Sequence, residues 1–83
     1  MLGPEQAFGV ALREFRRNRD VSQERLGLVA KLDRTYISMV ERGLRSPTIR
    51  TVVILANALE VRPSELVRRT EELLFLKRRR PPR

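Results

Sequence analysis

SQERLGLVAKLDRTYISMVERG, residues 22–43, contains the start and stop signals of two short helices. Ser22 and Asp33 each carry a side-chain oxygen that can cap a helix by accepting a hydrogen bond from a backbone N–H within its first turn. Gly43 is suited to the position after a helix C-terminus, where the backbone is commonly left-handed. We therefore predict one helix that breaks at Lys31 and a second over Arg34–Arg42, joined by so short a turn that they cross at a large angle.

The apolar spacing in this stretch predicts which face of each helix is buried. Leu26, Val29 and Ala30 form the expected inward stripe of the first helix, and Ile37 and Val40 form that of the second. The opposite face of the second helix must then meet solvent or a ligand; it consists of Arg34, Thr35 and Ser38, with Tyr36 and Met39 at its edge.

The rest of the chain predicts three further helices, because apolar residues recur at intervals of three and four and no alternation of period two persists. Pro4 suits the first turn of a helix that ends near Asn18, Pro47 and Thr48 open another, and Pro63 opens the last, which frays near Lys77. Their expected inward residues are Phe8, Ala11, Leu12 and Phe15; Ile49, Val52, Leu55, Ala56 and Leu59; and Leu66, Val67, Thr70, Leu73 and Leu74. The predicted fold is all-α, a compact five-helix bundle.

The 83-residue chain contains neither cysteine nor histidine. It therefore lacks disulfides, thiolate chemistry, the usual zinc ligands and the commonest general base, so we expect no metal, no cofactor and no enzyme activity. No apolar run approaches the roughly 20 residues needed to span a bilayer, and the N-terminus lacks the regions of a signal peptide. The expectation is a cytoplasmic protein.

Charge suggests a polyanionic partner. The net charge is +8, from 18 basic and 10 acidic residues. Five of the basic residues lie in KRRRPPR, residues 77–83. Residues 1–76 therefore contain 13 basic and 10 acidic residues, a net charge of +3. Neutralised phosphates release counterions, which favours nucleic acid, although a solubilising surface has the same composition. We predict one domain over residues 1–76 and a disordered basic tail over residues 77–83 that either adds phosphate affinity or is only solvated.

Three segments resemble the Cro and phage-repressor (Xre) family of helix-turn-helix proteins: VSQERLG at 21–27, LDRTYISMVERG at 32–43 and RSPTIRTVVILANALEV at 45–61. The likeness spans about residues 8–66. It implies a lambda-repressor-like DNA-binding domain whose second motif helix lies in the major groove, with the N-terminus of the first against the phosphate backbone. It also implies phosphate contacts from Ser22, Gln23, Arg45, Ser46 and Thr48; alternatively, Ser46 and Thr48 only cap the next helix.

The outward face of the second motif helix supplies the candidates for base reading. Arg34 offers a planar fork that can bond guanine O6 and N7 together, and Thr35 offers a hydroxyl or a methyl group. Alternatively, Arg34 is an exposed arginine near Glu41 or a phosphate. Tyr36 can contact the sugar or phosphate or pack half in the core. Ser38 and Met39 reach bases only if the helix inserts deeply, and Met39 can equally fill a core gap.

The resemblance further implies an ion pair between Arg16 and Glu41 that ties the first helix to the end of the third. Two residues depart from the family pattern. Lys31 stands where a turn glycine is usual, and Gly27 stands where an alanine is usual. We expect a slightly reshaped turn, because a left-handed residue other than glycine costs about 1 to 2 kcal/mol.

The last helix carries apolar residues with few expected neighbours inside one subunit: Leu73, Leu74, Phe75 and Leu76. They predict a homodimer. The sequence therefore indicates a transcription regulator that binds a pseudo-palindromic operator and resembles the controller proteins of restriction-modification systems, which activate and repress their own promoters. An activator would also contact RNA polymerase. Phage-type repressors and antitoxin-type autorepressors share these features, and an adaptor that binds no DNA would not need Gln23, Arg34 and Arg45 around one surface.

Overall fold

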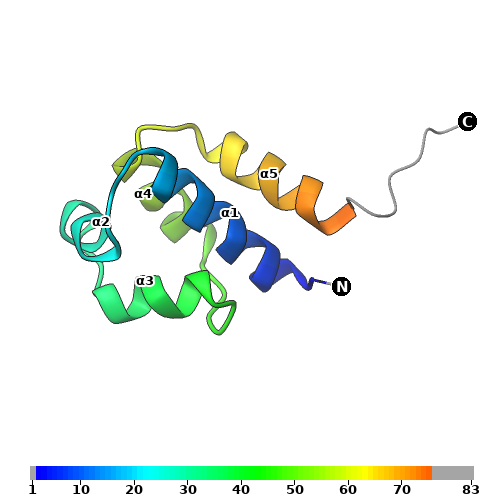
Figure 1. Ribbon diagram of the computed structural model, residues 1–83, viewed down its shortest axis with the longest axis horizontal. Coiled ribbons are helices and arrows are strands. Elements are labelled where there is room, and N and C mark those ends of the chain that lie inside the picture. The colour runs from blue at the N-terminus through cyan, green and yellow to red at the C-terminus, as the bar shows by residue number, and fades with distance from the viewer. Residues whose placement is uncertain (1, 76–83) are drawn as a thin grey trace, which may run out of the picture.

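The computed structural model describes residues 2–75, which form five helices and no strand (Figure 1). The helices are α1 (Pro4–Asn18), α2 (Gln23–Ala30), α3 (Arg34–Glu41), α4 (Ile49–Ala58) and α5 (Pro63–Phe75). Helix α1 packs against both α3 and α5, and α2 packs against α3 and α4. The all-α prediction is confirmed. Leu76 and the predicted basic tail at 77–83 lie outside the described residues.

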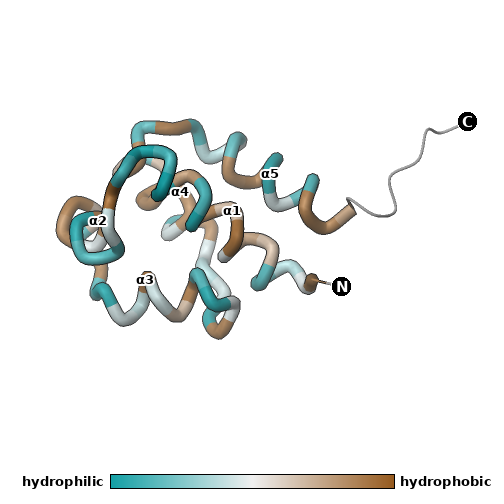
Figure 2. The backbone as a smooth tube through the Cα atoms, in the orientation of Figure 1, coloured by the Kyte–Doolittle hydropathy of each residue, from teal (hydrophilic) through white to brown (hydrophobic). Residues whose placement is uncertain are grey.

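One core joins all five helices. Every helix contributes at least one of the largest fully buried side chains, and Leu59, directly after α4, is another. These side chains are Leu12, Leu26, Ile37, Val40, Leu55, Leu59 and Leu66. Figure 2 shows polar and apolar residues following one another along α1 and α5, as expected for helices with one buried face. None of the described helices is long and apolar enough to cross a membrane.

Three residues predicted to face inward are exposed. Val29 is 50% exposed, Ile49 is 76% exposed and Val67 is 49% exposed. Each lies roughly 70° to 100° around its helix from the centre of the buried stripe, at 100° per residue. These short helices meet the small core along a narrow stripe, so that an apolar residue at the edge of the sequence pattern remains in solvent.

The caps that orient α2 and α3 are those predicted. Ser22 Oγ accepts a hydrogen bond from the Arg25 backbone N–H at 3.0 Å, and Asp33 Oδ1 accepts one from Thr35 at 3.2 Å. Lys31 is left-handed, with φ of 60°, and Gly43 has φ of 78°. Both helices of the motif are therefore followed by the left-handed backbone geometry that the sequence indicated.

The turn between α2 and α3 also explains the glycine at position 27. A Cβ atom there would lie 2.7 Å from the carbonyl oxygen of Leu32. The Leu32 N–H donates to the Gly27 carbonyl at 2.9 Å, which holds the two backbones together. An alanine at position 27 would crowd this turn, so Gly27 and the left-handed Lys31 together set the connection between α2 and α3.

A second glycine sets the approach of α1 to α3. A Cβ atom on Gly9 would lie 2.5 Å from the carbonyl oxygen of Val40 and closer still to that of Glu41. Only a residue without a side chain lets the two backbones approach this closely. The sequence analysis did not single out Gly9, because its partners lie some thirty residues away.

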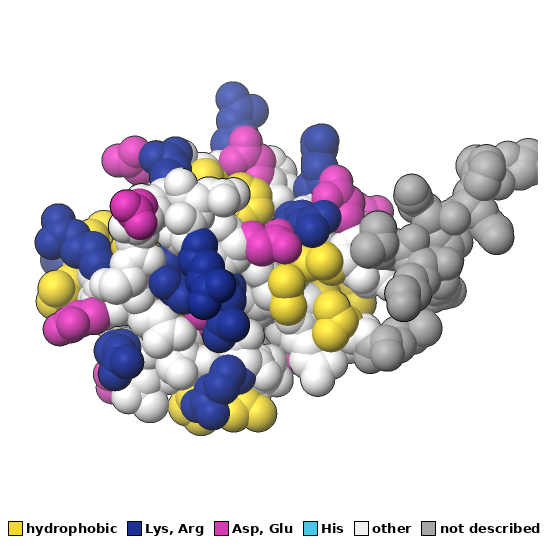
Figure 3. All heavy atoms as spheres, viewed as in Figure 1, with side chains coloured by type: hydrophobic (Ala, Val, Ile, Leu, Met, Phe, Trp, Pro, Cys, Tyr) yellow, Lys and Arg dark blue, Asp and Glu magenta, His cyan; other side chains and the backbone are white. Residues whose placement is uncertain are grey.

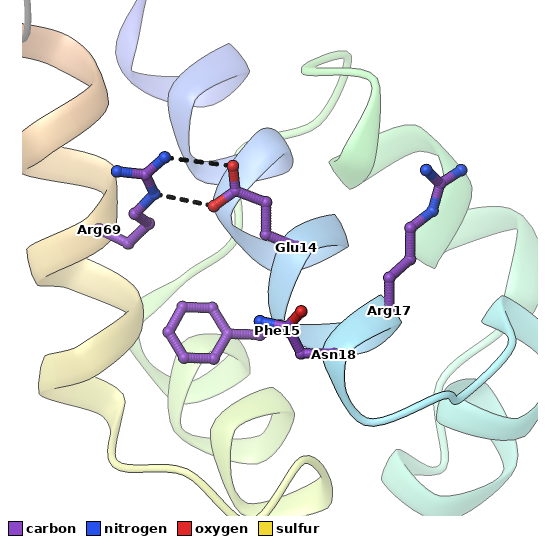
Figure 4. A pocket seen from close by; sticks show the side chains of 5 residues that line it. All are labelled: Glu14, Phe15, Arg17, Asn18 and Arg69. Atoms are coloured by element: carbon purple, nitrogen blue, oxygen red, sulfur yellow. Dashed lines mark hydrogen bonds and ion pairs between the residues drawn. The ribbon is translucent and has the colours of Figure 1, made fainter.

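On the side of α1 that packs against α5, an ion pair joins the two helices. Arg69 donates from Nε to Glu14 Oε1 at 2.8 Å and from Nη2 to Oε2 at 3.3 Å (Figure 4). Arg69 also pairs with Glu72 at 3.1 Å. These side chains are partly exposed, so water screens the interaction and its contribution to stability is modest.

Candidate nucleic-acid interface

Helix α3 presents a polar face outward, as predicted. Ile37 and Val40 are fully buried, whereas Arg34 and Thr35 are exposed at the N-terminal end of the helix. Ser38 and Met39, farther along, are partly buried. Recognition helices of this kind use their N-terminal residues on base edges, so the most accessible side chains stand where such contacts begin.

Tyr36 links α3 to the loop that follows it. Its ring is half-buried and packs against the core. The guanidinium carbon of Arg45 lies 5.4 Å from the ring centroid, within the range of a cation–π contact. The structure therefore brings a predicted base-reading residue and a predicted phosphate-binding residue together, a pairing that the sequence did not indicate.

Arg16 and Glu41 form the ion pair that the resemblance implied. Arg16 donates from Nε to Glu41 Oε2 at 2.6 Å and from Nη2 to Oε1 at 3.0 Å. Its Nη1 atom donates to the Val21 carbonyl at 2.9 Å. Both residues are buried, and the pair connects α1, the connection before α2 and the end of α3.

Gln23 and Arg13 also reach Glu41, which the sequence analysis missed. Gln23 Nε2 donates to Glu41 Oε1 at 2.9 Å, and Arg13 Nε donates to the same oxygen at 3.3 Å. Burial alone raises the pKa of Glu41, but the hydrogen bonds from Arg16 and Gln23 outweigh it, so that the pKa lies below its ordinary value of 4.5. Glu41 is thus an ionised centre that joins α1, α2 and α3.

The remaining predicted phosphate-binding residues lie at or just before helix starts. Ser22 caps α2, and Thr48 caps α4 by accepting from the Thr51 N–H at 3.1 Å. Ser46 is exposed in the loop before α4. Free N–H groups at a helix start favour an anion, so the capping role of Ser22 and Thr48 is compatible with a nearby phosphate.

The lowered pKa of Glu41 predicts acid sensitivity. A carboxyl whose pKa is lower in the folded state stabilises that state above pH 4.5, and this contribution is lost as the pH falls through the folded value. We expect the free energy of unfolding, measured by urea denaturation, to drop more between pH 6 and pH 3 in the wild type than in Arg16→Ala, which lacks the strongest hydrogen bond to Glu41. An equal drop in both proteins would contradict this assignment.

Comparisons with known proteins agree with this geometry. The helix-turn-helix family profile matches residues 12–66. The control protein C.SmaI of Serratia marcescens is 41% identical over 58 residues, which cover 70% of this chain and 69% of that protein. The control protein C.BamHI of Bacillus amyloliquefaciens is 38% identical over 61 residues, covering 72% and 75% of the two chains.

A solved structure gives the same result. The restriction-modification controller protein C.AhdI from Aeromonas hydrophila superposes with a TM-score of 0.72 at 43% identity, over 74% of this chain and 92% of that one. Residues 12–66, which the family profile matches, contain the capped α2, the exposed face of α3 and the Glu41 centre. This chain therefore belongs to the helix-turn-helix family of Xre type, and it is a DNA-binding transcription regulator close to the controller proteins of restriction-modification systems.

Proposed function

We propose that this protein binds a pseudo-palindromic operator as a homodimer and, as the controller of a restriction-modification system, regulates its own promoter in the cytoplasm. The observation that carries the proposal is the exposed start of α3, where Arg34 and Thr35 stand on a helix fixed from behind by Ile37, Val40 and the Glu41 centre. Similarity to control proteins over two thirds or more of their length supports the choice of regulator class.

In this proposal the contacts with DNA are of two kinds. Arg34 and Thr35 read base edges, with Arg34 on guanine O6 and N7, while Tyr36, Ser38 and Met39 lie farther along α3. The backbone contacts come from the starts of α2 and α4 and the loop before α4, that is from Ser22, Gln23, Arg45, Ser46 and Thr48. The guanidinium of Arg45 lies over the Tyr36 ring and makes no hydrogen bond within residues 2–75, so its donors are available to a phosphate.

The dimer interface in this proposal is the C-terminal part of α5. Leu73 and Leu74 are only partly buried in one subunit, and Phe75 is 45% exposed. Figure 3 shows hydrophobic side chains gathered between α1 and the described end of α5. For a twofold operator, the second copy that covers this face must also leave both α3 helices on one side of the dimer.

Selection from random duplex DNA with the full chain tests the proposal, together with the molecular mass from sedimentation. We expect a dimer and an enriched inverted repeat whose half-sites are about 34 Å, one helical turn, apart. Enrichment without an inverted repeat would contradict the dimeric operator. A protein that retains no DNA at low salt would be an adaptor instead.

A further inference from the structure

Arg13 on α1 and Gln23 at the start of α2 meet at one atom, Oε1 of Glu41. Gln23 Nε2 lies 2.9 Å from this oxygen and Arg13 Nε lies 3.3 Å from it. The two donor nitrogens are therefore no farther apart than the sum of these distances. Whatever lies against the side chain of Gln23 also lies close to the guanidinium of Arg13.

The charges at this point do not balance. Arg13 and Arg16 carry two positive charges, and Glu41, whose side chain is fully buried, supplies one negative charge. Arg16 is also buried, and all three of its guanidinium nitrogens are engaged, on Glu41 and on the Val21 carbonyl. The excess positive charge is thus presented by Arg13, the exposed member of the cluster.

Arg13 retains the donors that an anion needs. Its side chain is 43% exposed, and within residues 2–75 its guanidinium hydrogen bond is the single one from Nε to Glu41. Glu41 holds the Nε edge, which leaves the two Nη groups to donate outward. A guanidinium held in this way can bind two phosphate oxygens with little further loss of side-chain entropy.

We propose that Arg13 is a DNA phosphate-binding residue, which makes α1 a third element that contacts the DNA backbone beside the start of α2. The inference rests on the proposed function, which places Gln23 at the backbone. Figure 3 shows basic side chains gathered in the middle of one face, where α1, α2 and α3 come together in Figure 1. A phosphate here completes the charge balance of the Arg13–Arg16–Glu41 cluster.

The test is a salt series of DNA binding with Arg13→Gln in the full chain, on the selected operator and on an unrelated duplex. We expect roughly a 25- to 100-fold loss of affinity on both duplexes, because each subunit of the dimer loses one charge-assisted contact, about five- to tenfold per contact, without loss of base reading. The slope of log K against log salt should become shallower by about 1.8, which is about 0.9 for each of the two phosphates that a dimer contacts. Arg13→Lys, which keeps the charge, should restore the slope.

Arg62→Gln is the matched control, because Arg62 lies in the exposed connection between α4 and α5, across the molecule from α3 (Figure 1). It removes the same charge and should change the slope far less. Equal changes in the two variants would show an effect of overall charge and overturn the assignment of Arg13, as would an unchanged slope in Arg13→Gln. If the wild type binds no DNA, the proposed function fails, and this inference fails with it.

Discussion

Arg16→Ala is expected to lower the free energy of unfolding by about 3 kcal/mol, because it leaves the buried Glu41 carboxylate without its main partner. Removing one member of a buried pair typically costs 3 to 5 kcal/mol. We place this variant at the lower end, since Arg13 and Gln23 still donate to Glu41. For a domain of this size the loss corresponds to a drop of about 12 to 24 °C in melting temperature.

Arg13→Ala is the matched control, because it removes a second arginine from the same carboxylate. The Arg13 side chain is 43% exposed and its hydrogen bond is longer, so its loss should cost about 1 kcal/mol or less. Thermal and urea denaturation of both variants at neutral pH measure the difference. Equal melting temperatures would mean that the pair with Arg16 contributes no more than a surface ion pair.

Local signals made most of the fold predictable. A cap is a hydrogen bond within one turn, so Ser22 and Asp33 could be assigned from their neighbours in the sequence. The prolines at helix starts act equally locally. The width of a buried stripe is different, because it depends on how much of each helix the core covers. For that reason Val29 and Ile49 were wrongly assigned to the interior.

The candidate site was less accessible to sequence reasoning, because its contacts join residues far apart in the chain. The pair of Arg16 and Glu41 could be inferred only from a family resemblance. That Gln23 and Arg13 converge on the same carboxylate depends on how α1 and α2 each cross α3, and the close approach at Gly9 sets the first of these crossings. No periodicity in the sequence encodes that crossing, so the phosphate candidate on α1 emerged only from the structure.

Arg34→Ala is expected to relax base preference at one position in each half-site of the operator. A bidentate contact to guanine contributes about 1 to 3 kcal/mol of discrimination, and a dimer makes it twice. Affinity for the selected operator should therefore fall by roughly 30-fold or more, while affinity for an unrelated duplex changes far less. The folded state should be unaffected, because Arg34 is exposed and forms no ion pair within residues 2–75.

The pattern of loss across operator variants is what distinguishes reading from anchoring. We would titrate the protein against duplexes in which each base pair of the half-site is changed in turn. In the wild type, one guanine position should be costly to change, and in Arg34→Ala the same change should cost little. Gln23→Ala should instead weaken every duplex alike, since we propose that Gln23 contacts the DNA backbone. If Arg34→Ala also lowered all affinities by one common factor, Arg34 would be a phosphate contact, and base reading would pass to Thr35 and the residues beyond it on α3.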